Sequence, residues 1–422
     1  MVQINPAIER IIDEAEKDCR ECFEKLDRIE RHNTRRVLEA FQTHRVSARH
    51  FAPTTGYGYD DIGRDTLSVI MAELLGCEAA LVRPQIASGT HALALCLYGI
   101  LRPGDTMLAA SGRPYDTLEE VIGLSGKPGA GSLKEYGVGY REIDVPEGGG
   151  IDLPAIERAL REEPSIRLVE LQRSRGYAWR PSLSVEQMKE AAQMIHSIRP
   201  DAVVMADNCY GEFSDYQEPG MVGIDLMAGS MIKNPGGGLA PTGGYIAGRQ
   251  DLVELVSYRL TSPGIGAEVG SYAGSYQPFY QGLFEAPHVV AQAIKTAILT
   301  ARVFEKLGYD VNPRYDEPRA DIIQAIRFNE PEPLIAFIQG IQMNSPVDSE
   351  AIPEPWAMPG YQDPVIMAAG TFVAGASIEL SADAPVRPPY IAYMQGALTY
   401  AHGRCGLEGA LQHMLDRGLL RL

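Results

Sequence analysis

Apolar side chains recur with a helical period in the first fifty residues, where many of the other positions are charged. Ile11, Ile12, Phe23, Leu26 and Ile29 follow this spacing, which predicts polar N-terminal helices. The next stretch, residues 50–65, is rich in glycine, tyrosine and proline and has no periodicity. We expect a loop there.

Short apolar runs bounded by glycine, proline or aspartate follow, and such runs are typical of buried parallel strands. Helix-like segments lie between them, for example residues 153–163 and 184–198. The resulting β-α-β-α order predicts an α/β domain with a mainly parallel sheet. The predicted strands are residues 79–85, 106–111, 166–172, 202–208 and 244–249.

The pattern changes in the C-terminal third of the chain. A helical stretch over residues 288–308 leads into residues 329–370, where the many prolines predict short strands and loops. A strand pair and a last helix are expected to close the chain. We therefore predict an N-terminal helical arm and loop (1–60), a large α/β domain (61–285) and a smaller α+β domain (286–422).

Composition narrows the class of protein. The 422 residues exceed what one core usually serves, and 45% apolar with 22% charged residues is ordinary for a globular enzyme. The net charge of -17 argues against a nucleic-acid partner, because no basic stripe is available for phosphates. The sequence contains no run of 18 apolar residues, so no membrane span is expected. The first residues lack the pattern of a secretory signal. We expect a cytoplasmic protein.

Cysteine and histidine spacing predicts no metal site. Cys19 and Cys22 form a CxxC, but they lie in a charged helical stretch and no second pair completes a zinc site. The eight histidines form no paired ligand set. His91 follows a predicted helix start, where a packing or capping role is expected.

Three features in order carry the candidate chemistry. Ser88, Gly89 and Thr90 precede an apolar helix, where they cap free amides or bind a phosphate. Asp207 ends an apolar strand, where open α/β sheets place ligand contacts and where a carboxylate can face a cation.

Lys233 is the third feature and stands before glycines 236, 237 and 238. Glycines let the backbone pass close to a bound ring. Desolvation or a neighbouring cation is expected to lower the pKa of Lys233 and free its amine to form a Schiff base. A phosphate site, a carboxylate for a pyridine nitrogen and a lysine for an aldehyde predict pyridoxal 5'-phosphate as cofactor.

Several segments resemble the Cys/Met-metabolism family of pyridoxal-phosphate enzymes, which includes cystathionine lyases and methionine gamma-lyase. The resemblance is closest to the divergent bacterial branch of carbon-sulfur lyases associated with aluminium resistance. It implies the aminotransferase-like architecture, fold type I. It is carried by PTTGYGYDDIGRDTLSVIMAELLGCEAALVRPQIASGTHAL, RPYDTLEEVIG, LQRSRGYAWRPSL, ADNCYGEF and GSMIKNPGGGLAPTGGYIAG.

The resemblance also implies roles for further residues. Ser230 matches a serine near the cofactor phosphate, and Tyr115 an aromatic side chain that stacks on the pyridine ring and assists proton transfer. Tyr57, with Tyr59 as the alternate, matches a tyrosine that reaches the phosphate site of a neighbouring subunit. An active site at a dimer interface, in a dimer of dimers, is therefore expected. Arg387 is the candidate for binding the substrate carboxylate, since a guanidinium offers two donors.

The chain departs from the family pattern at two places. No arginine stands beside Tyr57, and an expected Asn-Pro pair is replaced by QRSRGYAWR. Gln172, Ser174 and Arg175 are alternatives for the cofactor contact at the second place.

The resemblance implies removal of a thiol from a sulfur amino acid, leaving a 2-oxo acid and ammonia. Transamination, racemisation or aldol cleavage, and a cofactor-binding stress protein with little turnover, are the alternatives.

Overall fold

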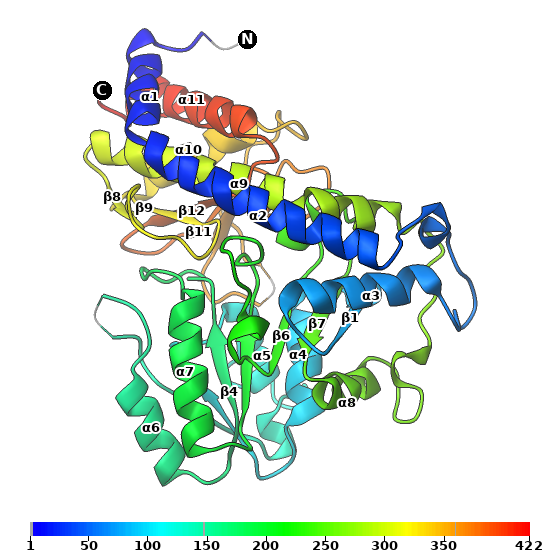
Figure 1. The fold of residues 1–422 in the computed structure, drawn as a ribbon. Coiled ribbons are helices and arrows are strands. Elements are labelled where there is room, and N and C mark those ends of the chain that lie inside the picture. Colours follow the sequence, from blue (N-terminus) through cyan, green and yellow to red (C-terminus); the bar gives the residue numbers. More distant parts are fainter. Residues whose placement is uncertain (1–2, 147, 359) are drawn as a thin grey trace.

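The larger of two sheets has seven strands and lies in the lower half of the molecule (Figure 1). The computed structural model describes residues 3–146, 148–358 and 360–422. The strand order of the seven-stranded sheet is β1-β7-β6-β5-β4-β2-β3, and β2 to β6 pair in parallel. The predicted α/β class is therefore confirmed. The strands are β1 (Ala79–Arg83), β2 (Thr106–Ala109), β3 (Gly139–Glu142), β4 (Ile166–Gln172), β5 (Val203–Asp207), β6 (Leu226–Ser230) and β7 (Gly244–Gly248).

The prediction that residues 244–249 form a parallel strand is wrong. Strand β7 runs antiparallel to both of its neighbours, β6 and β1. A parallel return needs a crossover, usually a helix, that carries the chain over the sheet. Residues 231–243 instead contain only the 3₁₀ turn η4 (Asn234–Gly236) and turn back beside β6. This connection contains Lys233.

Helices cover both faces of this sheet. Apolar residues of α3, α6 and α7 share one core with α2 (Arg20–Thr43) and α9 (Gln277–Lys306), while those of α4, α5 and α8 form a second core on the opposite face. The helices are α3 (Ile62–Leu75), α4 (Gly89–Ile100), α5 (Asp116–Ile122), α6 (Leu153–Glu162), α7 (Val185–Ile198) and α8 (Gln250–Leu260). The predicted helices at 153–163 and 184–198 correspond to α6 and α7.

The C-terminal part is built on an antiparallel sheet in the order β10-β11-β12-β9-β8, packed against α10 (Pro331–Met343) and α11 (Tyr400–Asp416). The prediction of only strands and loops between 329 and 370 is wrong over α10. Leu334, Phe337, Ile338 and Ile341 have helical spacing and are buried. Proline is tolerated in the first turn, so the prolines there do not exclude a helix. The strands are β8 (Asp310–Asn312), β9 (Gln324–Arg327), β10 (Val365–Ala368), β11 (Ser381–Pro385) and β12 (Ile391–Gln395).

The predicted N-terminal helices are α1 (Pro6–Asp18) and α2 (Arg20–Thr43). The apolar face of α1, with Ile8 and Ile12, is buried in the C-terminal core beside α11. The backbone amide of Asn5 donates to Gln412 Oε1 at 2.7 Å, so the two ends of the chain lie together (Figure 1). Helix α2 lies along α9.

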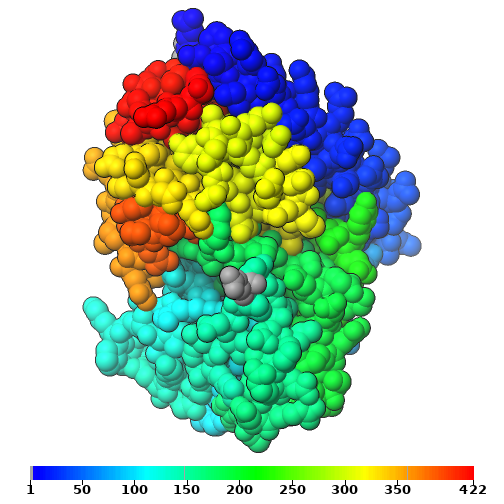
Figure 2. Space-filling model, turned by 90° about the vertical axis from the view of Figure 1, so that its left-hand side faces the viewer, coloured from blue at the N-terminus to red at the C-terminus, as the bar shows by residue number. Residues whose placement is uncertain are grey.

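Helix α9 (Gln277–Lys306) connects the two halves of the molecule. It starts earlier than the predicted helix at 288–308, and the expected domain boundary at 285/286 falls inside it. Its first half contributes Phe279 and Leu283 to the core of the large sheet, and its last turns contribute Phe304 to the C-terminal core. In the space-filling view the C-terminal segments, yellow to red, sit on the cyan and green segments of the large sheet (Figure 2). Within the described ranges, no helix is both long and apolar enough to cross a membrane.

Candidate active site

Most of the predicted site residues line one cavity of about 280 Å³. It lies beside the carboxyl end of β5 and is closed on its other side by residues of β11 and β12. A ligand there contacts both halves of the molecule. The sequence-predicted residues that line it are Ser88, Gly89, Thr90, Tyr115, Asp207, Ser230 and Lys233.

The first wall of the cavity is the start of helix α4. Ser88 caps this helix by accepting a hydrogen bond from the His91 amide at 3.0 Å, and His91 Nδ1 accepts one from the Ala87 amide at 3.0 Å. A Cβ atom added at Gly89 would lie 3.1 Å from Cys209 Sγ and 3.7 Å from Ser230 Cβ. The glycine therefore keeps open the space in front of the first amides of α4. Free amides and the helix dipole make this wall suitable for an anion.

The second wall is Asp207, the last residue of β5. Its Oδ1 atom accepts a hydrogen bond from the Cys209 amide at 3.1 Å. Burial raises the pKa of Asp207, and the nearby ammonium of Lys233 opposes that rise. A carboxyl group buried in this way favours a cationic partner.

Lys233 completes the set, but its protonation differs from the sequence expectation. Its Nζ atom lies 4.0 Å from the centre of the Tyr210 ring. Burial acts to lower the pKa of Lys233, yet Cys209, Tyr210 and Asp207 outweigh burial and hold the pKa above its ordinary value. The expectation of a lowered pKa is wrong for the protein without a ligand, because it left out Cys209, Tyr210 and Asp207, which favour the protonated amine.

Tyr115 covers another side of the cavity, immediately before α5. Its hydroxyl lies 2.8 Å from the Tyr361 hydroxyl. Burial, together with the neighbouring Tyr177 and Tyr361, raises the pKa of Tyr115 well above its ordinary value. Tyr115 is therefore a neutral phenol at physiological pH, able to donate a proton but not to act as a phenolate.

Two predicted residues lie outside this cavity. Tyr57 is 72% exposed on the loop before α3, with its ring 5.6 Å from that of Tyr59. Arg387 lines an adjoining cavity and forms an ion pair with Asp363 at 2.7 Å. The two cavities share Tyr115.

The three alternatives from the QRSRGYAWR segment are also separated. Ser174 lines the lysine cavity, whereas Gln172 and Arg175 line the adjoining one. The Arg175 side chain is buried and donates to the carbonyl of Asn312 at 2.6 Å, an interaction that ties the two halves together.

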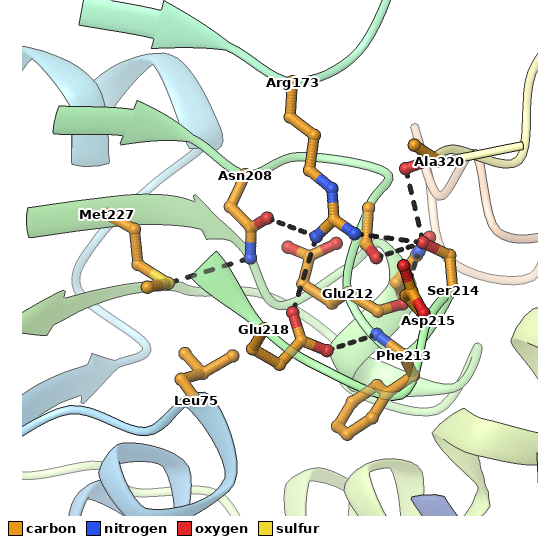
Figure 3. A network of polar contacts seen from close by, with 12 residues as sticks. Leu75, Arg173, Asn208, Glu212, Phe213, Ser214, Asp215, Glu218, Met227 and Ala320 are labelled. Carbon is orange, nitrogen blue, oxygen red and sulfur yellow. Dashed lines mark hydrogen bonds and ion pairs between the residues drawn. The ribbon is translucent and has the colours of Figure 1, made fainter. Parts of the chain in front are cut away.

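A buried polar network behind the cavity supports the loop after Asp207 (Figure 3). Arg173 donates to Asn208 at 2.8 Å and to Ser214 at 3.2 Å, and forms an ion pair with Glu218 at 3.4 Å. Glu218 in turn accepts a hydrogen bond from the Phe213 amide at 2.7 Å. The ion pair is fully buried, so the loop is held by interactions that water cannot replace.

Sequence reasoning missed the wall contributed by the C-terminal half. Asp383, Tyr393 and Gln395 line the cavity from β11 and β12, and Tyr177 and Tyr361 line it from loops. Tyr177 lies in the segment that departs from the family pattern, which was the only available signal. The others come from a region whose short strands carry no motif.

The cavity fits the cofactor expected from the sequence. It offers amides for an anion at α4, a carboxyl group for a cation at Asp207 and an amine for a carbonyl carbon at Lys233. The space beside Gly89, in front of the first amides of α4, is open because glycine has no Cβ atom to fill it. Among the described residues, no group of three or more histidine, cysteine, aspartate or glutamate side chains is placed to hold a metal ion.

Known proteins resemble this chain in sequence and in structure. The family model for methionine gamma-lyase matches residues 8–415. The uncharacterized protein YnbB of Bacillus subtilis is 51% identical over 407 residues, 96% of either chain. A crystal structure of a carbon-sulfur lyase involved in aluminum resistance, from Clostridium novyi NT, is 51% identical. It superposes with a TM-score of 0.94 over 97% of this chain and 96% of that one. The L-methionine gamma-lyase of Pseudomonas putida is 30% identical over 224 residues, 51% of this chain and 49% of that one.

Proposed function

Because the chain belongs to the methionine gamma-lyase family, we propose that it is a pyridoxal-phosphate-dependent carbon-sulfur lyase. Its substrate is a sulfur amino acid with a thioether or thiol side chain, of the methionine, cystathionine or cysteine type. The carbon-sulfur bond breaks and the thiol leaves with a proton. Addition of one water then gives a 2-oxo acid and ammonium, so that atoms and charge balance.

One observation carries the proposal: Lys233, Asp207 and the capped start of α4 line the same cavity. These groups come from three separate segments of the chain and have little reason to meet for packing alone. A buried lysine facing a buried carboxyl group, beside free helix amides, is the combination that this cofactor needs.

The bound cofactor supplies an electron sink for the charge left when the α-carbon loses its proton. The α4 amides, with Ser230, bind the phosphate, and Asp207 holds a protonated ring nitrogen in place. Tyr115 covers the ring and, as a neutral phenol, is suited to donate a proton to the leaving thiol. The Lys233 amine moves the proton from the α-carbon.

The protonation of Lys233 is part of this scheme. Cys209 and Tyr210, followed by Asp207, raise the pKa of Lys233 in the protein without a ligand. A cation bound to Asp207 offsets the contribution of that carboxylate, so the pKa of the lysine falls. Cofactor binding at Asp207 therefore favours the neutral amine that acts as a base.

We also propose that the active site is completed by a second copy of the chain, within a dimer or a dimer of dimers. Such an assembly is supported by exposed apolar side chains on three neighbouring helices: Leu38 on α2, Val69 on α3 and Phe284 on α9. Tyr57, or Tyr59, then reaches the phosphate site of the partner. Arg387 binds the substrate carboxylate from the adjoining cavity. Light scattering during size-exclusion chromatography measures the assembly, and a fully active monomer would contradict it.

The first experiment is the absorption spectrum of the purified protein before and after borohydride reduction. A near-visible band that reduction removes, with a pyridoxyl group mapped to Lys233, supports the proposal. Lys233→Ala is expected to lose the band and most turnover while staying folded. Absence of the band after addition of pyridoxal phosphate would refute both cofactor and residue roles.

A substrate panel then tests the reaction. Release of thiol, 2-oxo acid and ammonia without an amino acceptor is the expected result. Amino transfer to a keto acid, racemised substrate or an aldehyde product would replace the lyase assignment by one of the alternative reactions. Cofactor binding without any turnover would favour the stress protein.

A further inference from the structure

The cavity wall from the second sheet carries a carboxyl group that forms no ion pair within the described part of the chain. Asp383 lies on β11 and lines the same cavity as Lys233. Its Oδ1 atom is buried and has no hydrogen-bond partner among the described residues, and its Oδ2 atom accepts only from Gln395 Nε2, at 3.5 Å. Burial raises the pKa of Asp383 to about 6, so the group still ionises at neutral pH.

Aromatic rings surround this carboxyl group. Tyr393 is the cross-strand neighbour of Asp383, and its ring lies 5.2 Å from that of Tyr177. Tyr177 continues to Tyr115 at 5.7 Å and to Tyr361 at 6.0 Å. The Tyr177 hydroxyl is buried and forms no hydrogen bond of 3.5 Å or less within the described structure, but it is close enough to Asp383 to lower the pKa of that carboxyl group. Ring faces attract cations, and a carboxylate among them strengthens that attraction.

The protein itself offers little to neutralise Asp383. Of the described residues that line the cavity, Lys233 is the one with a cationic side chain. In the protein without a ligand Lys233 acts to lower the pKa of Asp383, but under the proposed function its amine is committed to the cofactor. An ionised carboxylate left without a partner in a buried site is unfavourable, so a cation from the ligand is the natural complement.

We propose that Asp383 and the tyrosines around it bind an ammonium group on the departing thiol, and so select sulfur amino acids whose sulfur substituent ends in a cation. The inference rests on the proposed function and narrows its substrate class. Asp383 determines specificity here and takes no part in bond breaking. A neutral S-methyl group, as in methionine, leaves the carboxylate unpaired and is a poorer substrate.

A matched pair of substrates tests this on the cofactor-loaded protein. S-(2-aminoethyl)-L-cysteine and S-propyl-L-cysteine have the same number of heavy atoms, and only the first carries the extra cation. The homocysteine homologues are assayed in parallel to cover elimination at the next carbon. We expect kcat/KM to favour the aminoethyl compound by about 10- to 100-fold, as for a hydrogen bond to a charged group.

Asp383→Asn is expected to reduce this ratio to within about threefold of one, while Asp383→Glu retains a clear preference. A wild-type protein that does not prefer the cationic substrate, or an Asn variant with an unchanged ratio, would overturn the inference. If Asp383→Asn does not fold by circular dichroism, Tyr361→Leu, at a half-buried position, replaces it. This variant should also lower the ratio, and an unchanged ratio counts against the inference.

Failure of the proposed function gives a different result. If neither compound is cleaved, calorimetry on the cofactor-loaded protein still measures the ratio of their Kd values in wild type and Asp383→Asn. If the wild type prefers the cationic compound and Asp383→Asn does not, the proposed cation-binding site is supported and only the lyase function is refuted. Equal Kd values of the two compounds in the wild type would refute the proposed cation-binding site.

Discussion

Gly89→Ala separates the cofactor role of the α4 start from its structural role. Gly89 is the first residue of α4, and its φ lies outside the left-handed region, so alanine is compatible with the backbone. The new methyl group would lie 3.1 Å from Cys209 Sγ, in the space where the proposed phosphate meets the helix amides. The substitution therefore fills that space without breaking the helix.

The substitution changes two free energies, which are measured separately. The contact with Cys209 requires a shift of a few tenths of an ångström, and such overpacking costs about 1–3 kcal/mol of folding free energy. Loss of one hydrogen bond to a charged group costs about 1.5–3 kcal/mol of binding free energy. At about 1.4 kcal/mol for each factor of ten, the Kd for pyridoxal phosphate should rise about 10- to 150-fold.

The assay is a titration of cofactor-free protein with pyridoxal phosphate, followed by its absorption, alongside thermal unfolding of the cofactor-free protein. Gly99→Ala is the matched control at the other end of α4. Its Cβ atom would lie 3.0 Å from Val256 Cα, away from the cavity, so it should lower the Tm and leave the Kd unchanged. A wild-type Kd for Gly89→Ala would refute phosphate binding at this helix.

Three further outcomes are expected. Asp207→Asn should keep bound cofactor but lose about 100-fold or more in kcat, and normal turnover would show that another group holds the ring nitrogen. Arg173→Met leaves Glu218 buried without its cation and should cost about 3–5 kcal/mol in urea unfolding, so an unchanged midpoint contradicts the network in Figure 3. Burial, with the charge of Asp207 adding to it, raises the pKa of Glu170 to about 8. Glu170 then keeps its proton in the folded state from its unfolded pKa up to about 8, and stability falls with rising pH across that window by up to about 1.4 kcal/mol per unit. Glu170→Gln should flatten the decline between pH 5 and 8, and identical slopes would contradict it.

The large sheet and its ligand-facing end could be predicted because both are encoded locally. Residues such as Val203 to Asp207 form an uninterrupted apolar run ending in a carboxylate, and such a run has few alternatives to a central strand. Ser88 caps its own helix within three residues of sequence. Such patterns depend on residues close together in the chain, so they can be recognised without knowledge of the tertiary contacts.

What the sequence did not reveal depends on distant contacts. The direction of β7 is fixed by a short turn that replaces a crossover, and the pKa of Lys233 is raised by Cys209, Tyr210 and Asp207, which come from another segment of the chain. Asp383 reaches the cavity only because the second sheet packs over the first, and its own segment carries no motif. Helix α10 was hidden because its prolines outweighed four correctly spaced apolar residues.

The pairing of α1 with α11 has a consequence for how the protein is made. Helix α1 leaves the ribosome with Ile8 and Ile12 on one face, but α11, which together with α9 packs against α1, lies far later in the chain, at residues 400–416. At about 5–20 residues per second, roughly twenty seconds or more separate the two. During that interval α1 exposes an apolar stripe on the nascent chain. The packing of α1 is thus completed long after its own synthesis, and chaperones that bind exposed apolar segments have a defined target in it.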